Sequence, residues 1–239
     1  MIRACVDAPL AVGARIALPE DAAGHLVRVL RLGVGDACVL FNGDGNDYDA
    51  RIVSISKGSV EADIGSAREV RNESPLRIVL VQGIARGEKM DWILQKATEL
   101  GVAGIVPVHG ERGEVRLDGE RAGKRLRHWR SVVVSACEQS GRARKPEVAA
   151  PRGLADALAD LPATRLMLDP EAARPLPTRI DDHACAIAIG PEGGWSPSDM
   201  ATLAAAGFVG ARLGPRVLRT ETAGIAAIAA LQAFAGDFA

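Results

Sequence analysis

After Pro75, short apolar segments alternate with helical ones. This alternation constrains the fold more than any other feature of the sequence. Segments with the length and composition of buried strands lie at 76–82, 104–108, 165–168, 184–189 and 211–213. Helical stretches separate them, most clearly EKMDWILQKATELG at 88–101, where apolar residues repeat at helical spacing and Gly101 suits a C-terminal cap. This alternation predicts an α/β domain with a mostly parallel sheet.

Residues 1–70 follow a different pattern. Short strand-like segments lie at 2–6, 14–18, 37–41, 48–55 and 60–64. The polar turn NGDGN at 42–46 separates two of them, as a hairpin requires, and one helical piece lies around 21–30. We therefore predict a small β-barrel over residues 1–70 and a second domain over residues 71–239.

The composition restricts the class of protein. With 48% hydrophobic and 25% charged residues, the chain is typical of soluble globular proteins, and its formal net charge of −1 excludes a basic field over the whole molecule. The four cysteines are scattered without a C-x-x-C pair, which argues against a zinc site or a disulfide framework. No apolar stretch resembles a signal peptide or is long enough to span a bilayer. We expect a cytoplasmic protein that binds neither metal nor membrane.

A second helix is predicted over about 120–140, with Trp129 on its apolar stripe. It contains KRLRHWR at 124–130, in which four cations surround a histidine and a tryptophan. Cations interleaved with an aromatic residue suit a phosphate backbone. A solvated helix face explains the same pattern, and for this stretch alone we favour that interpretation.

The stretch IAIGPEGGWSPSD at 187–199 runs from a strand of small residues into three glycines, after which Ser196 and Pro197 open a helix. Glycines in this position let a ligand approach the backbone closely. A tight strand-to-helix connection capped by Ser196 explains them equally well. The chain has no G-x-G-x-x-G or Walker A motif, so an ordinary dinucleotide or nucleoside triphosphate site is disfavoured.

The stretch LGPRVLRTETA at 213–223 turns at Gly-Pro and then opens an apolar helix. Thr220 or Thr222 can cap that helix, and Glu221 suits its first turn because the helix dipole favours a carboxylate there. Arg219 is a cation at the same helix start and opposes the dipole. A local rule broken without evident compensation points to a functional role.

Five stretches, in this order, resemble the ribosomal RNA small-subunit methyltransferase E family of the SPOUT class. They are HLVRVLRLGVGD at 25–36, EKMDWILQKATELGV at 88–102, ACEQSGR at 136–142, IGPEGGWS at 189–196 and LGPRVLRTETA at 213–223. The resemblance implies an N-terminal PUA-like β-barrel followed by a SPOUT α/β domain with a C-terminal trefoil knot. The pattern alone predicts a Rossmann-like sheet, because knots are nearly absent among folds.

The same resemblance implies a homodimer that methylates N3 of a uridine in 16S rRNA of the small ribosomal subunit, with S-adenosylmethionine (SAM) as donor. It implies that three loops hold SAM, through Leu168, Gly190, Pro191, Gly193, Gly194, Leu213, Gly214, Leu218, Thr220, Thr222 and Ala223. A guanidinium near the uracil oxygens favours the reactive N3 anion, and Arg219 is the candidate. Glu221 either accepts the proton or orients Arg219, and we favour orientation. The candidate RNA contacts are Arg3, Arg28, Arg31, Arg86, Lys89, Lys96 and Arg112.

Two other functions are compatible with the sequence. The chain could be another SPOUT enzyme, acting on a ribose 2′-hydroxyl or a tRNA base, but the match at EKMDWILQKATELGV argues against it. It could instead be a non-catalytic RNA-binding assembly factor that keeps the knot. The intact RTETA stretch and glycine loop argue against that alternative.

Overall fold

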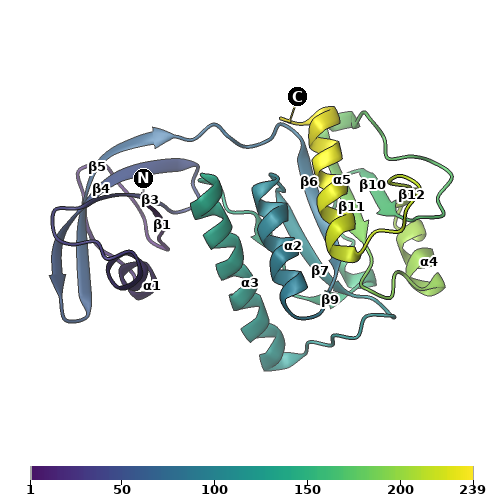
Figure 1. Cartoon of the computed structure of the whole chain (residues 1–239), viewed down its shortest axis with the longest axis horizontal. Helices are drawn as coiled ribbons and strands as arrows, with labels where there is room; N and C mark the ends of the chain where they lie inside the picture. Colours follow the sequence, from purple (N-terminus) through teal and green to yellow (C-terminus); the bar gives the residue numbers. More distant parts are fainter. Residues whose placement is uncertain (1, 239) are drawn as a thin grey trace. The chain divides into compact units, whose positions relative to one another are not determined.

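The computed structural model describes residues 2–238, which form two compact units (Figure 1). The first unit comprises the chain as far as Glu73 together with Cys137–Lys145. The second unit comprises Ser74–Ala136 and the chain from Pro146 onward. The boundary between the units therefore falls inside a long helix, α3 (Gly119–Ser140).

The first unit is built on a five-stranded sheet with the order β1-β3-β4-β5-β2. Its strands are β1 (Arg3–Cys5), β2 (Arg15–Ala17), β3 (Ala37–Phe41), β4 (Asn46–Ser56) and β5 (Ser59–Glu69). β1 pairs with β3 in parallel, and the other pairs are antiparallel. The predicted hairpin turn between β3 and β4 is confirmed, with Gly43 and Gly45 at φ values of +100° and +98°. Such angles favour glycine because it has no Cβ.

The helix predicted around 21–30 is present but changes its winding. α1 (Glu20–Gly24) continues directly into a π-helical turn, η1 (His25–Val29), in which the Leu30 N–H donates to the His25 carbonyl at 3.0 Å. Leu26 lies on its inner side, wholly buried in the core of the unit. Arg31 follows with φ at +59°, an uncommon angle for a residue other than glycine.

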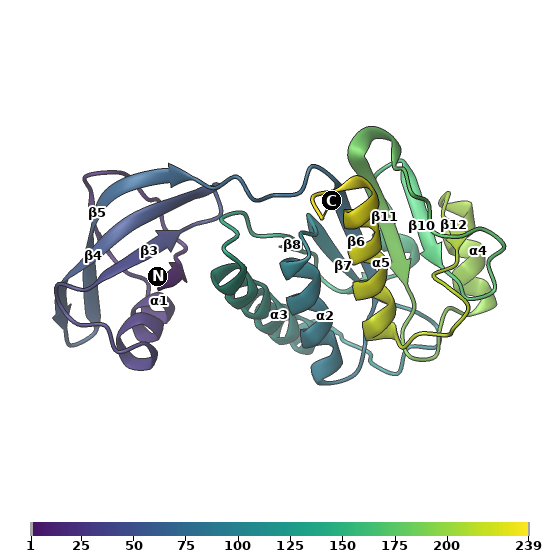
Figure 2. The same cartoon turned by 45° about the horizontal axis from the view of Figure 1, so that its top comes forward.

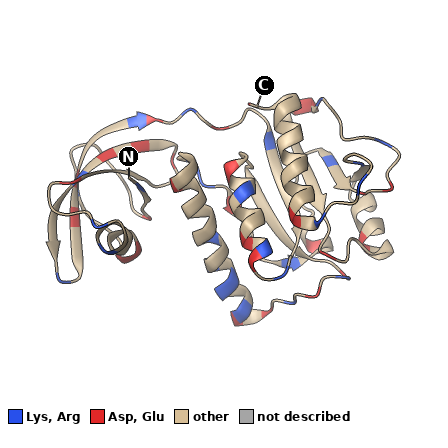
Figure 3. Cartoon of the chain, viewed as in Figure 1, with Lys and Arg blue, Asp and Glu red and all other residues tan. Residues whose placement is uncertain are grey.

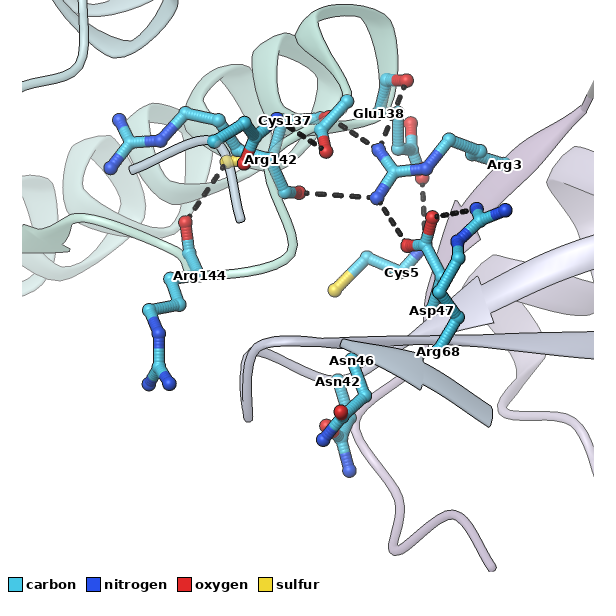
Figure 4. A network of polar contacts seen from close by, with 12 residues as sticks. Arg3, Cys5, Asn42, Asn46, Asp47, Arg68, Cys137, Glu138, Arg142 and Arg144 are labelled. Carbon is cyan, nitrogen blue, oxygen red and sulfur yellow. Dashed lines mark hydrogen bonds and ion pairs between the residues drawn. The ribbon is translucent and has the colours of Figure 1, made fainter. Parts of the chain in front are cut away.

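The segment Cys137–Lys145 belongs to the first unit through a buried network around Arg3 (Figure 4). The Arg3 guanidinium lies 2.6 Å from the Asp47 carboxylate and donates to the Cys137 carbonyl oxygen at 2.8 Å. Arg142, from the same segment, pairs with Glu73 at 2.5 Å. Arg3 is 11% and Asp47 6% exposed at the side chain. Arg3 was expected to contact RNA, but the structure places its charge inside the unit, against a carboxylate and backbone carbonyls.

The second unit has the parallel sheet that the alternating pattern predicts. Its order is β12-β10-β11-β6-β7-β8, with β9 also paired to β7, and every pair is parallel. The strands are β6 (Arg77–Gly83), β7 (Gly104–His109), β8 (Glu147–Val148), β9 (Arg152–Gly153), β10 (Thr164–Leu168), β11 (Ala184–Ile189) and β12 (Val209–Ala211). The strand predicted at 211–213 ends at Ala211 because only 209–211 pair with β10, so Leu213 lies in the loop beyond it.

Helices cover both faces of this sheet (Figures 1 and 2). Leu203 of α4 (Pro197–Ala205) packs in one core cluster with Ala188, whereas the next residue, Ile189, faces Gly224 of α5 (Thr220–Ala235). Because neighbouring strand residues point to opposite faces, α4 and α5 lie on opposite sides. α2 (Glu88–Glu99) packs beside α5. Two short 3₁₀ turns, η2 (Ala155–Ala157) and η3 (Asp181–His183), complete the elements.

Two helix starts test the expected caps. Ser196 caps α4 as predicted, accepting from the Asp199 N–H at 3.0 Å, while the Asp199 carboxylate accepts from the Ser196 N–H. The cap predicted for α5 at Thr220 or Thr222 is wrong. The N-cap is Arg219, whose side chain makes no capping bond, and Thr220 is already helical. The Thr220 hydroxyl instead donates to the Gly190 carbonyl oxygen at 2.6 Å, in a different loop.

Within residues 2–238, no helix combines the length and the apolar character that crossing a membrane requires.

Candidate active site

A pocket of about 730 Å³ opens in the second unit at the C-terminal ends of β10, β11 and β12. These three strands are parallel neighbours, so their following loops emerge at the same edge of the sheet. That edge is where open α/β sheets bind ligands. The three loops begin at Asp169, at Gly190 and at Arg212, and they are the loops that the resemblance assigns to SAM.

Most predicted site residues line this pocket. The expected cofactor contacts among them are Leu168, Gly190, Pro191, Gly193, Gly194, Leu213, Leu218, Thr220 and Ala223. Both proposed catalytic residues, Arg219 and Glu221, also line it. Gly214 and Thr222 are absent from the lining, and Thr222 is exposed.

In the loop after β11, Gly190–Trp195, the backbone packs closely against itself and against Arg112. The Gly194 N–H donates to the Pro191 carbonyl oxygen at 2.8 Å, and Gly194 has φ at +69°. A Cβ on Gly190 would lie 3.1 Å from the Gly194 backbone, and one on Gly193 would lie 3.0 Å from Arg112. A side chain at either position would therefore push these segments apart. We call Gly190–Trp195 the glycine loop.

The cap of α4 also positions the neighbouring loop after β7. Besides closing the capping box, the buried Asp199 carboxylate accepts from the Glu111 N–H at 3.0 Å. This bond holds residues 110–112 beside the glycine loop, where Arg112 donates to the Trp195 carbonyl oxygen at 3.4 Å. Arg112 thereby enters the pocket lining from a part of the sequence far from the three loops.

Lys89 and two carboxylates form the charged side of the pocket. The Lys89 ammonium lies 3.3 Å from Glu192 Oε1 and 4.0 Å from Glu221 Oε2. Burial raises the pKa of Glu192, but the hydrogen bond from the Arg86 N–H and the charge of Lys89 outweigh it, so the pKa is lowered overall. The carboxylate of Glu192 therefore stays ionised beside Lys89. The oxygen Glu221 Oε2 is buried and accepts no hydrogen bond within the described residues.

The geometry changes the role expected of Glu221. Within residues 2–238, Glu221 pairs with Lys89, on α2, and not with Arg219. Arg219 is exposed at the start of α5 and makes no ion pair with any of these described residues. Orientation of Arg219 by Glu221 is therefore not seen, and Lys89 is the cation that Glu221 holds.

The other candidate RNA contacts are dispersed. Arg28 and Arg31 are exposed on the first unit, at and just after the π-helical turn. Arg86 lines the pocket and pairs with Glu114 at 2.6 Å. Lys96 pairs with Glu99 within α2, outside the pocket. Figure 3 shows a further group of Lys and Arg positions along the N-terminal half of α3, in the KRLRHWR stretch.

Ten lining residues were not predicted as contacts, namely Asp169, Pro170, Glu171, Ile189, Glu192, Trp195, Met200, Ala211, Arg216 and Val217. Five of them lie inside the quoted stretches 187–199 and 213–223, and Met200 directly follows the first stretch, so their position in the chain was the available signal. Asp169–Glu171 lie in the loop after β10, which no quoted stretch covers. Among residues 2–238 no group of histidine, cysteine, aspartate and glutamate side chains could hold a metal ion.

Comparison with known families finds two matching domains. Residues 72–232 match the family described as the RNA methyltransferase domain, and residues 18–65 match the RNA methyltransferase PUA domain. Ribosomal RNA small subunit methyltransferase E of Buchnera aphidicola subsp. Schizaphis graminum is 34% identical over 234 residues, covering 93% of this chain and 92% of the relative. Its namesake from Mycobacterium bovis is 33% identical over 245 residues, covering 95% and 89%.

Two solved structures share the fold over nearly the whole length. The ribosomal RNA small subunit methyltransferase E of Neisseria gonorrhoeae, bound to S-adenosyl methionine, is 43% identical, with a TM-score of 0.94 and 100% of both chains covered. A Legionella pneumophila protein solved with bound SAM is 38% identical, with a TM-score of 0.94 and 99% of both chains covered. A PUA-like β domain followed by a parallel-sheet methyltransferase domain is thus confirmed. The chain belongs to the ribosomal RNA small subunit methyltransferase E family.

Proposed function

We propose that this chain transfers the methyl group of SAM to N3 of a uridine in 16S rRNA of the small ribosomal subunit. The observation that carries the proposal is the pocket at the ends of β10, β11 and β12, which gathers nine of the expected cofactor contacts with Arg219 and Glu221. Relatives at 38% and 43% identity over essentially the whole chain bind SAM.

The residues present fit this cofactor. The volume of about 730 Å³ is within the range of small-molecule sites, roughly 300–1,000 Å³. Gly190, Gly193 and Gly194 leave backbone groups open to a ligand in places that a Cβ would fill or strain. The negative side of the pocket, from Glu192 and Glu221, suits a ligand that carries a sulfonium and an ammonium group. When bound, SAM supplies a methyl group that is already activated by its sulfonium.

The protein's part in the reaction is to position the uridine and stabilise its anion. N3 passes its proton to the Glu221 carboxylate and forms the new N–C bond, while the methyl–sulfur bond breaks and its electron pair stays on sulfur. The exposed Arg219 guanidinium at the pocket can face the uracil oxygens and favour the anion. Lys89, held between Glu192 and Glu221, adds a second cation at the same mouth.

RNA contacts are proposed on both units. On the first, Arg28 and Arg31 are exposed around a π-helical turn, a feature that often marks functional sites. On the second we retain Arg86, Lys89, Lys96 and Arg112 as contacts. Arg3 is not retained because its guanidinium is enclosed. Since the substrate is ribosomal RNA, we place the protein in the cytoplasm.

We also propose a homodimer and a trefoil knot in the second unit. Two exposed aromatic side chains on the helices of one sheet face support a dimer, Trp92 on α2 at 46% and Phe234 on α5 at 52% exposure. The knot is supported by the path of the chain, which leaves β12 at one edge and returns as α5 onto β6 and β11.

A methylation assay with mapping of the product tests the function. The purified protein is incubated with methyl-labelled SAM and with small subunits or 16S rRNA that lack the modification. We expect labelled RNA and, after digestion, N3-methyluridine by mass spectrometry. Label on a ribose hydroxyl or on tRNA would identify another RNA methyltransferase, and RNA binding without SAM binding would identify an assembly factor. Either outcome would overturn the proposal.

A further inference from the structure

A buried polar network lies behind the pocket, where β6, the glycine loop and α5 meet. Gln82, near the end of β6, is wholly buried. Its Nε2 donates to the Gly83 carbonyl oxygen at 2.9 Å and to Thr220 Oγ1 at 3.0 Å. Thr220 Oγ1 in turn donates to the Gly190 carbonyl oxygen at 2.6 Å. Two side chains therefore join three segments that are far apart in sequence.

The Gly83 carbonyl determines the direction of every hydrogen bond in this network. A carbonyl oxygen only accepts, so the Gln82 amide must present Nε2 rather than Oε1 to it. The second amide hydrogen then points to Thr220 Oγ1. The single hydroxyl hydrogen of Thr220 is left for the Gly190 carbonyl. It is therefore not available to donate to a ligand in the pocket.

Packing alone does not explain a glutamine at this position. The oxygen Gln82 Oε1 is buried without a hydrogen-bond partner among the described residues, which is unfavourable for folding. Ile78 and Leu80 fill the same side of β6, and another leucine would avoid the unpaired oxygen. The apolar pattern of the strand is thus broken at the end that meets the pocket loops, where a functional constraint is expected.

The bond to Gly190 acts on the pocket wall. Gly190 opens the glycine loop, and a Cβ on Gly83 would lie 2.5 Å from the Pro191 nitrogen, so β6 packs directly against this loop. The loop has few side chains of its own, and the Thr220 hydroxyl supplies a polar tie between it and α5. Thr220 is the first residue of α5, so the same bond fixes the start of that helix against the glycine loop.

We propose that Gln82 is a positioning residue for the cofactor pocket. It orients the Thr220 hydroxyl and thereby holds the glycine loop and the start of α5 in the shape that binds SAM. The inference rests on the proposed function. Because Gln82 does not line the pocket, it acts on SAM only through Thr220 and the glycine loop. Its loss should weaken SAM binding, while methyl transfer at saturating SAM stays close to that of the wild type.

The test compares two buried glutamines of the second unit. Gln232, on α5, is also wholly buried, donates to the Leu100 carbonyl oxygen at 2.8 Å and accepts from the Ser74 hydroxyl at 2.6 Å, but it is not part of the pocket lining. Gln82→Leu and Gln232→Leu are measured for SAM affinity by calorimetry, for melting temperature, and for the single-turnover rate at saturating SAM. Thr220→Val and the double variant Q82L/T220V complete a double-mutant cycle.

We expect Gln82→Leu to raise the SAM dissociation constant about three- to tenfold, the range of one net hydrogen bond, while the saturating rate changes by less than about twofold. Gln232→Leu should lower the melting temperature and leave the dissociation constant at the wild-type value. The double variant should bind SAM about as well as Thr220→Val alone, because both substitutions break the same chain of bonds.

Three outcomes would overturn the inference: wild-type SAM affinity in Gln82→Leu, an equal loss of affinity in Gln232→Leu, or additive losses in the double variant. If Gln82→Leu does not fold, Thr220→Ser, which keeps the hydroxyl, is compared with Thr220→Val, and equal SAM affinities for the two would refute it. A wild-type protein that bound no SAM would instead refute the proposed function, so the two failures are distinguishable.

Discussion

Replacing Arg219 by alanine separates the chemistry of the site from its stability. Arg219 is exposed at the N-cap of α5, makes no capping bond with its side chain, and lines the pocket. Because a cation at a helix N-terminus opposes the dipole, its removal should leave the free energy of unfolding unchanged or raise it by about 0.3–1 kcal/mol. SAM affinity should change little, because the guanidinium is assigned to the uracil.

The rate of methyl transfer should fall sharply in the same variant. Losing one preorganised electrostatic donor lowers the rate by on the order of 10²–10³, or about 2.7–4 kcal/mol of transition-state stabilisation. The assay is single-turnover methylation of 16S rRNA at saturating SAM, with calorimetric SAM affinity and thermal unfolding measured on the same preparation.

Arg212→Ala is the matched control. Arg212 is an exposed arginine at the beginning of the same loop but outside the pocket lining, and its N–H, which alanine retains, donates to the Arg174 carbonyl oxygen at 2.8 Å. It should methylate at the wild-type rate. A wild-type rate in Arg219→Ala, or a loss of rate that only parallels unfolding, would refute the catalytic assignment of Arg219.

Three further substitutions test other parts of the structure. Gly194→Val should abolish SAM binding measured by calorimetry, because Gly194 has φ at +69° in the glycine loop; normal binding would show that the pocket is misassigned. Arg3→Leu should lower the free energy of unfolding by about 3 kcal/mol in urea, the low end for removing one partner of a buried pair, because Asp47 keeps Arg68. A surface-like change below about 0.5 kcal/mol would refute the burial argument. Arg28→Ala should reduce the slope of log K against log salt for rRNA binding by about 0.9 if its phosphate is in a duplex, whereas an unchanged slope would remove Arg28 from the interface.

Local sequence patterns correctly predicted the features that depend on only a few neighbouring residues. The helix over 88–99, the turn between β3 and β4 and the Ser196 cap depend on spacing and on residue types, and all three were predicted. The parallel sheet followed from the alternation of strands and helices. The two quoted stretches, 187–199 and 213–223, also identified most of the pocket, because parallel strand ends meet at one edge.

Tertiary contacts determined the side-chain partners that local sequence rules did not predict or predicted wrongly. Thr220 was expected to cap its own helix, but its hydroxyl bonds to Gly190 because Gln82 occupies its acceptor side. Arg3 was expected to contact RNA, but Asp47 and the Cys137 carbonyl oxygen enclose its guanidinium.

The partners of buried polar groups explain why the sequence predicted some features and only the structure showed the others. Helical and strand periodicity, turns and caps are set by neighbours in the chain, so the sequence by itself determined the elements and the edge where the pocket lies. A buried donor or charge is paired with whatever group the fold brings near it. The Gln82 amide nitrogen bonds to Thr220, Glu221 lies beside Lys89 and Arg3 pairs with Asp47, and each partner is dozens of residues or more away in the sequence. Only the tertiary structure therefore decided which charges face the pocket and which hold the protein together.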